Sequence, residues 1–149
     1  MKFKSKIYLS YDDVLSMVKQ LEYDVSKMRP DIVVGIQRGG VVPALHLSHA
    51  LDRPMEVVVW QTRDGIDTTM SDAVYEALDR GNVVLFVDDI NDSGRTLQEI
   101  IQACNLKGDY NHLIKTAVLV EKTSSIHKAD SKALRIDDER WIVFPWEKD

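Results

Sequence analysis

The chain has 149 residues, of which 44% are hydrophobic and 29% are charged. This length suits one globular domain with a substantial core, so we expect a single domain over residues 1–149. The formal net charge of −5 lacks the basic excess of a general nucleic-acid-binding protein, and no nucleic-acid partner is expected. The chain has one cysteine, which excludes an internal disulfide and a cysteine-pair metal site.

No apolar run approaches the roughly 18 residues of a membrane-spanning helix, so no membrane partner is expected. The first six residues include three lysines and lack the apolar segment of a secretory signal peptide. We therefore expect a cytoplasmic protein.

Strand-like and helix-like patterns alternate from the start of the chain. Residues 7–9 suit a short edge strand. Ser10 suits a helix N-cap, and apolar residues then recur three and four positions apart, which predicts an amphipathic helix over residues 11–28. Residues 31–36 read as a buried strand, and a second helix begins near Val41.

A short polar loop joins this second strand to its helix. It contains Arg38, Gly39 and Gly40, at the edge where open α/β sheets bind ligands. A cation beside backbone N–H groups suits a pyrophosphate, although the three residues alone are a weak signal. Residues 56–60 form a third strand, and the long polar segment 61–82 predicts a flexible lid with one helical turn near residues 74–78.

The most informative stretch covers residues 83–97. Five apolar residues predict a buried strand that ends before Asp88 and Asp89. Ser93, Gly94 and Thr96 then lead into a helix over residues 96–105. The first N–H groups of a helix have no backbone partners and its dipole is positive there, so this loop predicts a phosphate site.

Three carboxylates share this loop and would repel a phosphate unless they face another group. Asp88, Asp89 and Asp92 can only accept hydrogen bonds when ionised, which suits the vicinal hydroxyls of a ribose. The loop therefore predicts a ribose 5-phosphate site, and it matches neither the Walker nor the dinucleotide glycine pattern. An acidic turn that caps an ordinary helix is the alternative.

Further strands are expected over residues 115–120, 133–136 and 141–144. With these motifs in view, residues 83–96 resemble the phosphoribosyl pyrophosphate loop of type I phosphoribosyltransferases. The tail, residues 138–147, resembles the hood of the bacterial xanthine–guanine and hypoxanthine enzymes of that family. The resemblance implies an α/β fold: a doubly wound parallel sheet of about five strands with a small C-terminal hood over residues 122–149.

The resemblance also implies a reaction. A 5-phosphoribosyl group would move from phosphoribosyl pyrophosphate to a 6-oxopurine base with Mg²⁺ as cofactor, as in purine salvage. Asp92 would take or share the N7 proton of the base. Phosphoribosyl pyrophosphate would contact Arg38, Gly39, Gly40, Asp88, Asp89, Asp92, Ser93, Gly94, Arg95 and Thr96.

The remaining implied contacts involve the base and the metal. Lys122 would donate to the 6-oxygen, Trp141 would stack on the ring, and the backbone of Ile142 would meet the base edge. Asp88, Asp89 and Glu147 would lie near the metal. The family often has a cis peptide in the pyrophosphate loop, and here it would join Gln37 to Arg38.

Three positions depart from the family pattern. Asn91 stands where an aliphatic residue is usual, Val143 replaces an acidic residue of the hood, and Arg63 lies in an altered lid. Two other functions stay open: a non-catalytic regulator that binds a nucleotide or phosphoribosyl pyrophosphate, and a phosphoribosyltransferase for another base. A homodimer or homotetramer is expected.

Overall fold

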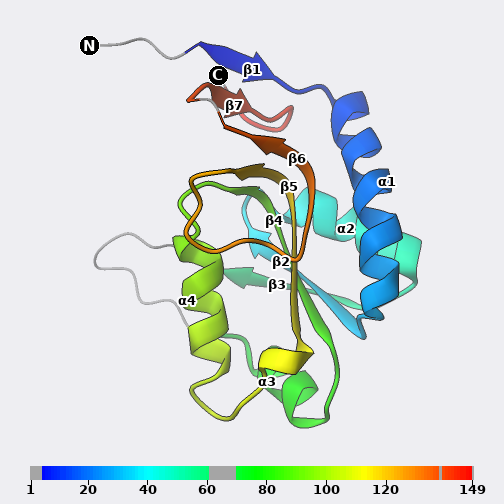
Figure 1. Ribbon diagram of the computed structural model, residues 1–149. Helices are drawn as coiled ribbons and strands as arrows, with labels where there is room; N and C mark the ends of the chain where they lie inside the picture. The colour runs from blue at the N-terminus through cyan, green and yellow to red at the C-terminus, as the bar shows by residue number, and fades with distance from the viewer. Residues whose placement is uncertain (1–4, 61–69, 138, 149) are drawn as a thin grey trace.

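The computed structural model describes residues 5–60, 70–137 and 139–148. Its central sheet has five parallel strands in the order β3-β2-β4-β5-β6 (Figure 1). The strands are β2 (Ile32–Gln37), β3 (Met55–Val59), β4 (Val84–Asn91), β5 (Ile114–Lys122) and β6 (Ser131–Ile136). The helices are α1 (Tyr11–Met28), α2 (Val41–Leu51), α3 (Asp72–Asp79), α4 (Arg95–Cys104) and the 3₁₀ turn η1 (Asn111–Leu113).

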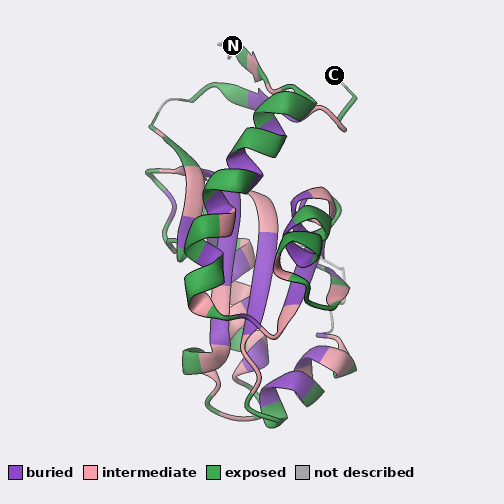
Figure 2. Cartoon of the chain, turned by 90° about the vertical axis from the view of Figure 1, so that its right-hand side faces the viewer, coloured by how far each residue is buried: buried purple, intermediate pink, exposed green. Residues whose placement is uncertain are grey.

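Helices cover both faces of this sheet, and side-chain alternation along the strands divides the core between them. Val33 and Leu85 pack with α1 and α2, whereas Val34 and Phe86 pack with α3 and α4. Figure 2 shows the buried strands between helices whose outer surfaces are exposed. The predicted doubly wound α/β architecture is therefore confirmed.

Local signals in the sequence explain where α1 begins. The Ser10 hydroxyl accepts a hydrogen bond from the Asp13 N–H at 3.0 Å, and the Asp13 carboxylate accepts one from the Ser10 N–H at 2.8 Å. This reciprocal capping box satisfies two N–H groups at the helix start. The predicted N-cap and the predicted span of residues 11–28 are both confirmed.

A second, two-stranded sheet lies at the top of Figure 1. It pairs β1 (Lys6–Tyr8) with β7 (Trp141–Val143) in parallel, so segments from opposite ends of the described chain lie side by side. The sequence predicted both strands but not their pairing. Strand β7 lies in the C-terminal part that was expected to form a hood, whereas β1 comes from the start of the described chain.

Several predicted boundaries were wrong. Strand β6 begins at Ser131 rather than at residue 133, and the larger differences are in β4 and α3. Strand β4 continues through Asp88 and Asp89 to Asn91, because its backbone keeps pairing with β5 beyond the apolar run. Helix α3 is longer than the expected single turn, and the Ser71 hydroxyl caps it by accepting from the Val74 N–H at 3.4 Å. The first part of the expected lid, residues 61–69, lies outside the described residues.

None of the helices in the described part of the chain is long and apolar enough to cross a membrane.

Candidate functional site

The order of the strands places the site. Strand β3 lies next to β2 at one edge of the sheet. The chain then crosses to β4, which lies next to β2 on the opposite side, and continues through β5 to β6 at the other edge. The loops that follow β2 and β4 therefore lead away from each other at the carboxyl ends of two neighbouring strands. Open α/β sheets bind ligands at this kind of switch point.

Two glycines let the loop after β2 lie directly on the end of β4. A Cβ atom on Gly39 would come within 1.9 Å of Asp89 Oδ2, and one on Gly40 would come within 2.2 Å of the Val87 carbonyl oxygen. Any larger residue would separate the loop from the acidic end of β4. The Gln37–Arg38 peptide in this loop is cis, as predicted.

The two adjacent acids at this contact are electrostatically unfavourable when no ligand is bound. Burial, and then the charge of Asp89, raise the pKa of Asp88 well above its usual value. Burial also raises the pKa of Asp89, against hydrogen bonds from Asp88 and from the Ile90 N–H. A cation or hydroxyl donors at this position would therefore stabilise the ionised carboxylates.

Glu147 lies close enough to affect the pKa of one member of this pair. Its negative charge adds to the rise in the pKa of Asp89. One of its oxygens accepts a hydrogen bond from the Phe144 N–H at 2.8 Å, which closes a turn near the end of the chain. The tail thus brings a third carboxylate toward Asp88 and Asp89.

The predicted phosphate loop turns at Gly94 and enters α4. Gly94 has φ +93°, a left-handed conformation that favours glycine, and α4 begins at Arg95, one residue before the predicted start. The Ser93 hydroxyl accepts from the Arg95 N–H at 3.2 Å. The Arg95 guanidinium pairs with Glu99 at 3.5 Å and so runs along the helix surface. Thr96 lies in the first turn of α4.

The connection between β5 and β6, which we call the 123–130 loop, packs against this phosphate loop. The Ile126 N–H donates to the Ser93 carbonyl oxygen at 2.9 Å. A Cβ atom on Gly94 would come within 2.5 Å of the backbone nitrogen of His127. The sequence offered no signal for this contact, because the loop is polar and irregular.

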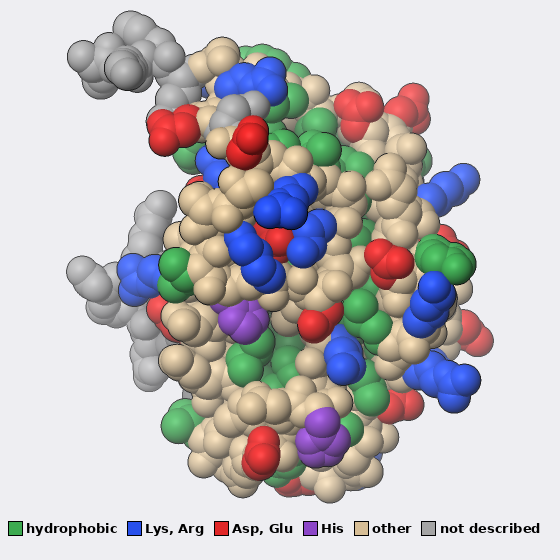
Figure 3. Space-filling view, in the orientation of Figure 1, with side chains coloured by type: hydrophobic (Ala, Val, Ile, Leu, Met, Phe, Trp, Pro, Cys, Tyr) green, Lys and Arg blue, Asp and Glu red, His purple; other side chains and the backbone are tan. Residues whose placement is uncertain are grey.

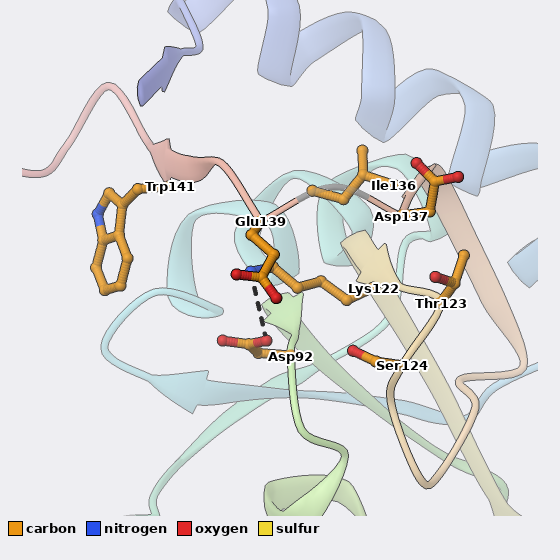
Figure 4. Close-up of a pocket in the computed structure, with 8 residues that line it drawn as sticks. All are labelled: Asp92, Lys122, Thr123, Ser124, Ile136, Asp137, Glu139 and Trp141. Atoms are coloured by element: carbon orange, nitrogen blue, oxygen red, sulfur yellow. Dashed lines mark ion pairs between the residues drawn. The ribbon is translucent and has the colours of Figure 1, made fainter. Parts of the chain in front are cut away.

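A cavity of about 260 Å³ lies beside the phosphate loop (Figure 4). Lys122 at the end of β5 directs its ammonium group to Asp92, with Nζ 3.6 Å from Oδ1. Trp141 borders the cavity with 57% of its surface exposed. Sequence reasoning missed the other lining residues, which are Thr123, Ser124, Ile136, Asp137 and Glu139.

Ile142 does not line this cavity. Its side chain is buried in the core that α1 and α2 cover, and its backbone lies in β7 opposite Ile7. Only its backbone is therefore left to meet a ligand, and a backbone contact is what the family resemblance implied for Ile142.

Basic side chains gather in the upper middle of the face shown in Figure 3, over the region of β5, β6 and the connection between them. Because the whole chain carries a net charge of −5, this excess of positive charge is local. Such a patch raises the local concentration of anionic ligands.

The fold and site together define an α/β protein with a candidate phosphate-binding loop at the switch point of its sheet. Residues 6–148 match the phosphoribosyl transferase domain, so the chain belongs to that family, as the sequence predicted. It is an enzyme that transfers phosphoribosyl groups.

Known relatives cover nearly the whole chain. The xanthine-guanine phosphoribosyltransferase of Cereibacter sphaeroides is 28% identical over 94% of this chain and 86% of its own length. The crystal structure of a purine phosphoribosyltransferase from Pyrococcus horikoshii is 31% identical, with a TM-score of 0.77 over 97% of this chain and 95% of that one. The Helicobacter pylori xanthine-guanine-hypoxanthine phosphoribosyltransferase is 26% identical, with a TM-score of 0.73 over 95% of this chain and 93% of its own.

Proposed function

We propose that this enzyme transfers the 5-phosphoribosyl group of phosphoribosyl pyrophosphate to a 6-oxopurine base and releases pyrophosphate. Relatives that are xanthine-guanine and hypoxanthine-guanine phosphoribosyltransferases support this substrate class. The proposal includes a homodimer or homotetramer in the cytoplasm.

The pairing of Asp92 with Lys122 is the observation that favours a 6-oxopurine. N7 and O6 of such a base lie next to each other on one edge of the ring. With a proton on N7, the base offers a donor and an acceptor side by side. Asp92 can accept from N7–H and Lys122 can donate to O6, because their charged atoms are 3.6 Å apart. Trp141 provides an exposed aromatic face for the ring.

The bond changes follow from this arrangement. The bond between ribose C1 and the pyrophosphate oxygen breaks, and a bond forms between C1 and N9 of the base. Bond formation at N9 puts positive charge on the N7-protonated ring. The N7 proton therefore passes to the Asp92 carboxylate and then to water, which leaves a neutral base in the nucleotide. The oxocarbenium character of C1 develops while the pyrophosphate leaves with the electron pair.

The loops that follow β2 and β4 hold the pyrophosphate and the 5-phosphate of phosphoribosyl pyrophosphate, respectively. Arg38 and the backbone N–H group of Gly39 face the leaving pyrophosphate. The Gly40 N–H, which the sequence also predicted to contact it, instead donates to the Ile36 carbonyl oxygen at 2.9 Å. The first turn of α4, with Ser93 and Thr96, holds the 5-phosphate, as at other helix N-termini. Binding energy at this remote phosphate orients C1 toward the base.

The acidic end of β4 suits Mg²⁺. This ion usually takes one or two carboxylates together with substrate phosphates, and Asp88 and Asp89 offer two adjacent carboxylates beside the pyrophosphate loop. The part of the chain that the structure describes contains no cluster of three or more acidic, His or Cys side chains that could hold a metal without substrate. When bound, Mg²⁺ would neutralise charge on the leaving pyrophosphate.

A panel of bases tests the proposal. Pyrophosphate release and nucleotide formation are measured with phosphoribosyl pyrophosphate, Mg²⁺ and each of hypoxanthine, guanine, xanthine and adenine. We expect the 6-oxopurines to react and adenine to be slower by at least about tenfold, which corresponds to 1.4 kcal/mol. Equal rates with adenine would contradict the role of Lys122. If none of the three 6-oxopurines reacts, the proposed acceptor class is wrong.

A further inference from the structure

A buried polar pair directly precedes, in sequence, two of the residues that line the cavity. Asn91 is the last residue of β4 and Glu121 is its register partner on β5. Only 3% of the surface of Asn91 and 1% of that of Glu121 is exposed. The Asn91 amide donates to Glu121 Oε1 at 2.8 Å. A carboxylate buried this deeply is costly unless every lone pair finds a donor.

The surrounding groups satisfy this carboxylate. The Ala129 N–H donates to Glu121 Oε1 at 2.7 Å, and Lys132 Nζ lies 2.9 Å from Oε2. The same amide of Asn91 also donates to the His127 carbonyl oxygen at 2.7 Å. Burial would raise the pKa of Glu121, but the hydrogen bonds from Lys132, Ala129 and Asn91 hold it below its usual value.

The position of the pair in the strands connects it to the site. Asp92 follows Asn91, and Lys122 follows Glu121, so each member of the pair directly precedes a residue that lines the cavity. The pair therefore fixes the alignment of β4 with β5 at Asn91 and Glu121, and with it the backbone positions from which the side chains of Asp92 and Lys122 project. Its hydrogen bonds to residues 127 and 129 also hold the 123–130 loop, which packs on Gly94 of the phosphate loop.

We propose that Asn91 and Glu121 are positioning residues that set the distance between Asp92 and Lys122 and hold the 123–130 loop against the phosphate loop. This inference rests on the proposed function, because Asp92 and Lys122 are proposed to contact the base and the phosphate loop is proposed to hold the 5-phosphate. Asn91 and Glu121 themselves contact neither the base nor phosphoribosyl pyrophosphate. It acts through Asp92, Lys122 and the backbone of the 123–130 loop.

A double-mutant cycle between Asn91 and Lys122 tests the inference. Asn91→Val removes the amide and replaces it with a β-branched apolar side chain, which suits a strand. We expect it to lower kcat with hypoxanthine or guanine by at least about tenfold, since a displacement of 1 Å can cost 10²-fold. In the Lys122→Ala background the same substitution should cost clearly less, because the contact that Asn91 positions is already absent.

A control variant removes a comparable hydrogen bond at the other end of β4. The Asp31 carboxylate accepts from the Val83 N–H at 2.7 Å, just before the strand begins. This point is about 26 Å from Asn91, at the rise of an extended strand. Asp31→Ala should lower thermal stability while it leaves kcat and the preference for oxo over amino bases unchanged.

The possible results separate the two proposals. Reaction of the wild-type enzyme with any 6-oxopurine supports the proposed function whatever the Asn91 variants do. Equal losses in both backgrounds, or a loss that Asp31→Ala reproduces, would overturn the positioning role. If Asn91→Val does not fold, Asn91→Thr, which supplies a hydroxyl donor in place of the amide, enters the same cycle. If neither folds, the pair determines the fold and the positioning role is rejected.

Discussion

Replacing Gly39 by Ala is the most direct test of the contact between the two ligand loops. The new Cβ would lie 1.9 Å from Asp89 Oδ2, whereas ordinary contacts begin at 3.4 Å. Either the loop or the carboxylate must therefore move by about 1.5 Å to restore normal packing. The carboxylate is held by the Ile90 N–H at 2.7 Å, so the loop should give way in part.

A displacement of this size should be visible in kinetics. We expect Gly39→Ala to lower kcat/KM for phosphoribosyl pyrophosphate by about 10²-fold, because misplacement by 1 Å can have that effect. Initial rates over a range of phosphoribosyl pyrophosphate concentrations, at saturating base and Mg²⁺, measure this. Thermal unfolding should change little, since the loop lies at the surface of the site.

Gly81→Ala is the matched control. Gly81 has φ +80° with no atom within 4 Å of an added Cβ, so the substitution strains the backbone without a clash. It should lower stability by about 1 kcal/mol and leave kcat/KM unchanged. If Gly39→Ala retains wild-type kcat/KM, or loses activity only in proportion to stability, the argument from loop contact is refuted.

Three further variants have distinct expectations. Asp92→Asn should lower kcat by about 10²-fold in steady-state assays, with a smaller effect on phosphoribosyl pyrophosphate binding; near-normal turnover would make Asp92 structural. Lys122→Ala should reduce the rate advantage of guanine over adenine more than it weakens phosphoribosyl pyrophosphate binding, and an unchanged ratio would refute its role. Asp88→Asn should raise the unfolding free energy of the ligand-free enzyme by about 0.5–2 kcal/mol while abolishing its Mg²⁺-dependent activity. The raised pKa of Asp88 means that wild-type stability falls as pH rises from 3.8 toward that raised value, and urea unfolding at several pH values should show a smaller fall in Asp88→Asn.

Local pattern was sufficient for α1, for the presence of the strands and for the candidate phosphate loop, but not for the end of β4 or the length of α3. Helix α1 follows from its cap at Ser10 and its apolar spacing, because both signals act within a few residues. The Asp88–Thr96 stretch was recognisable because its residue types are contiguous in the chain. The candidate residues Asp92, Lys122 and Trp141 were chosen individually, and the structure brings them to one cavity.

Only the tertiary structure decided how distant segments meet. The contact between Gly39 and Asp89, the pairing of β1 with β7, and the hydrogen bond between Asn91 and Glu121 each join residues at least 30 positions apart. A polar residue such as Glu121 reads as solvent-exposed in isolation, because ionised side chains are rarely buried without partners. Its partners come from β4, from the 123–130 loop and from Lys132, and they assemble only when parallel strands are brought into register by packing of the helices on both faces of the sheet.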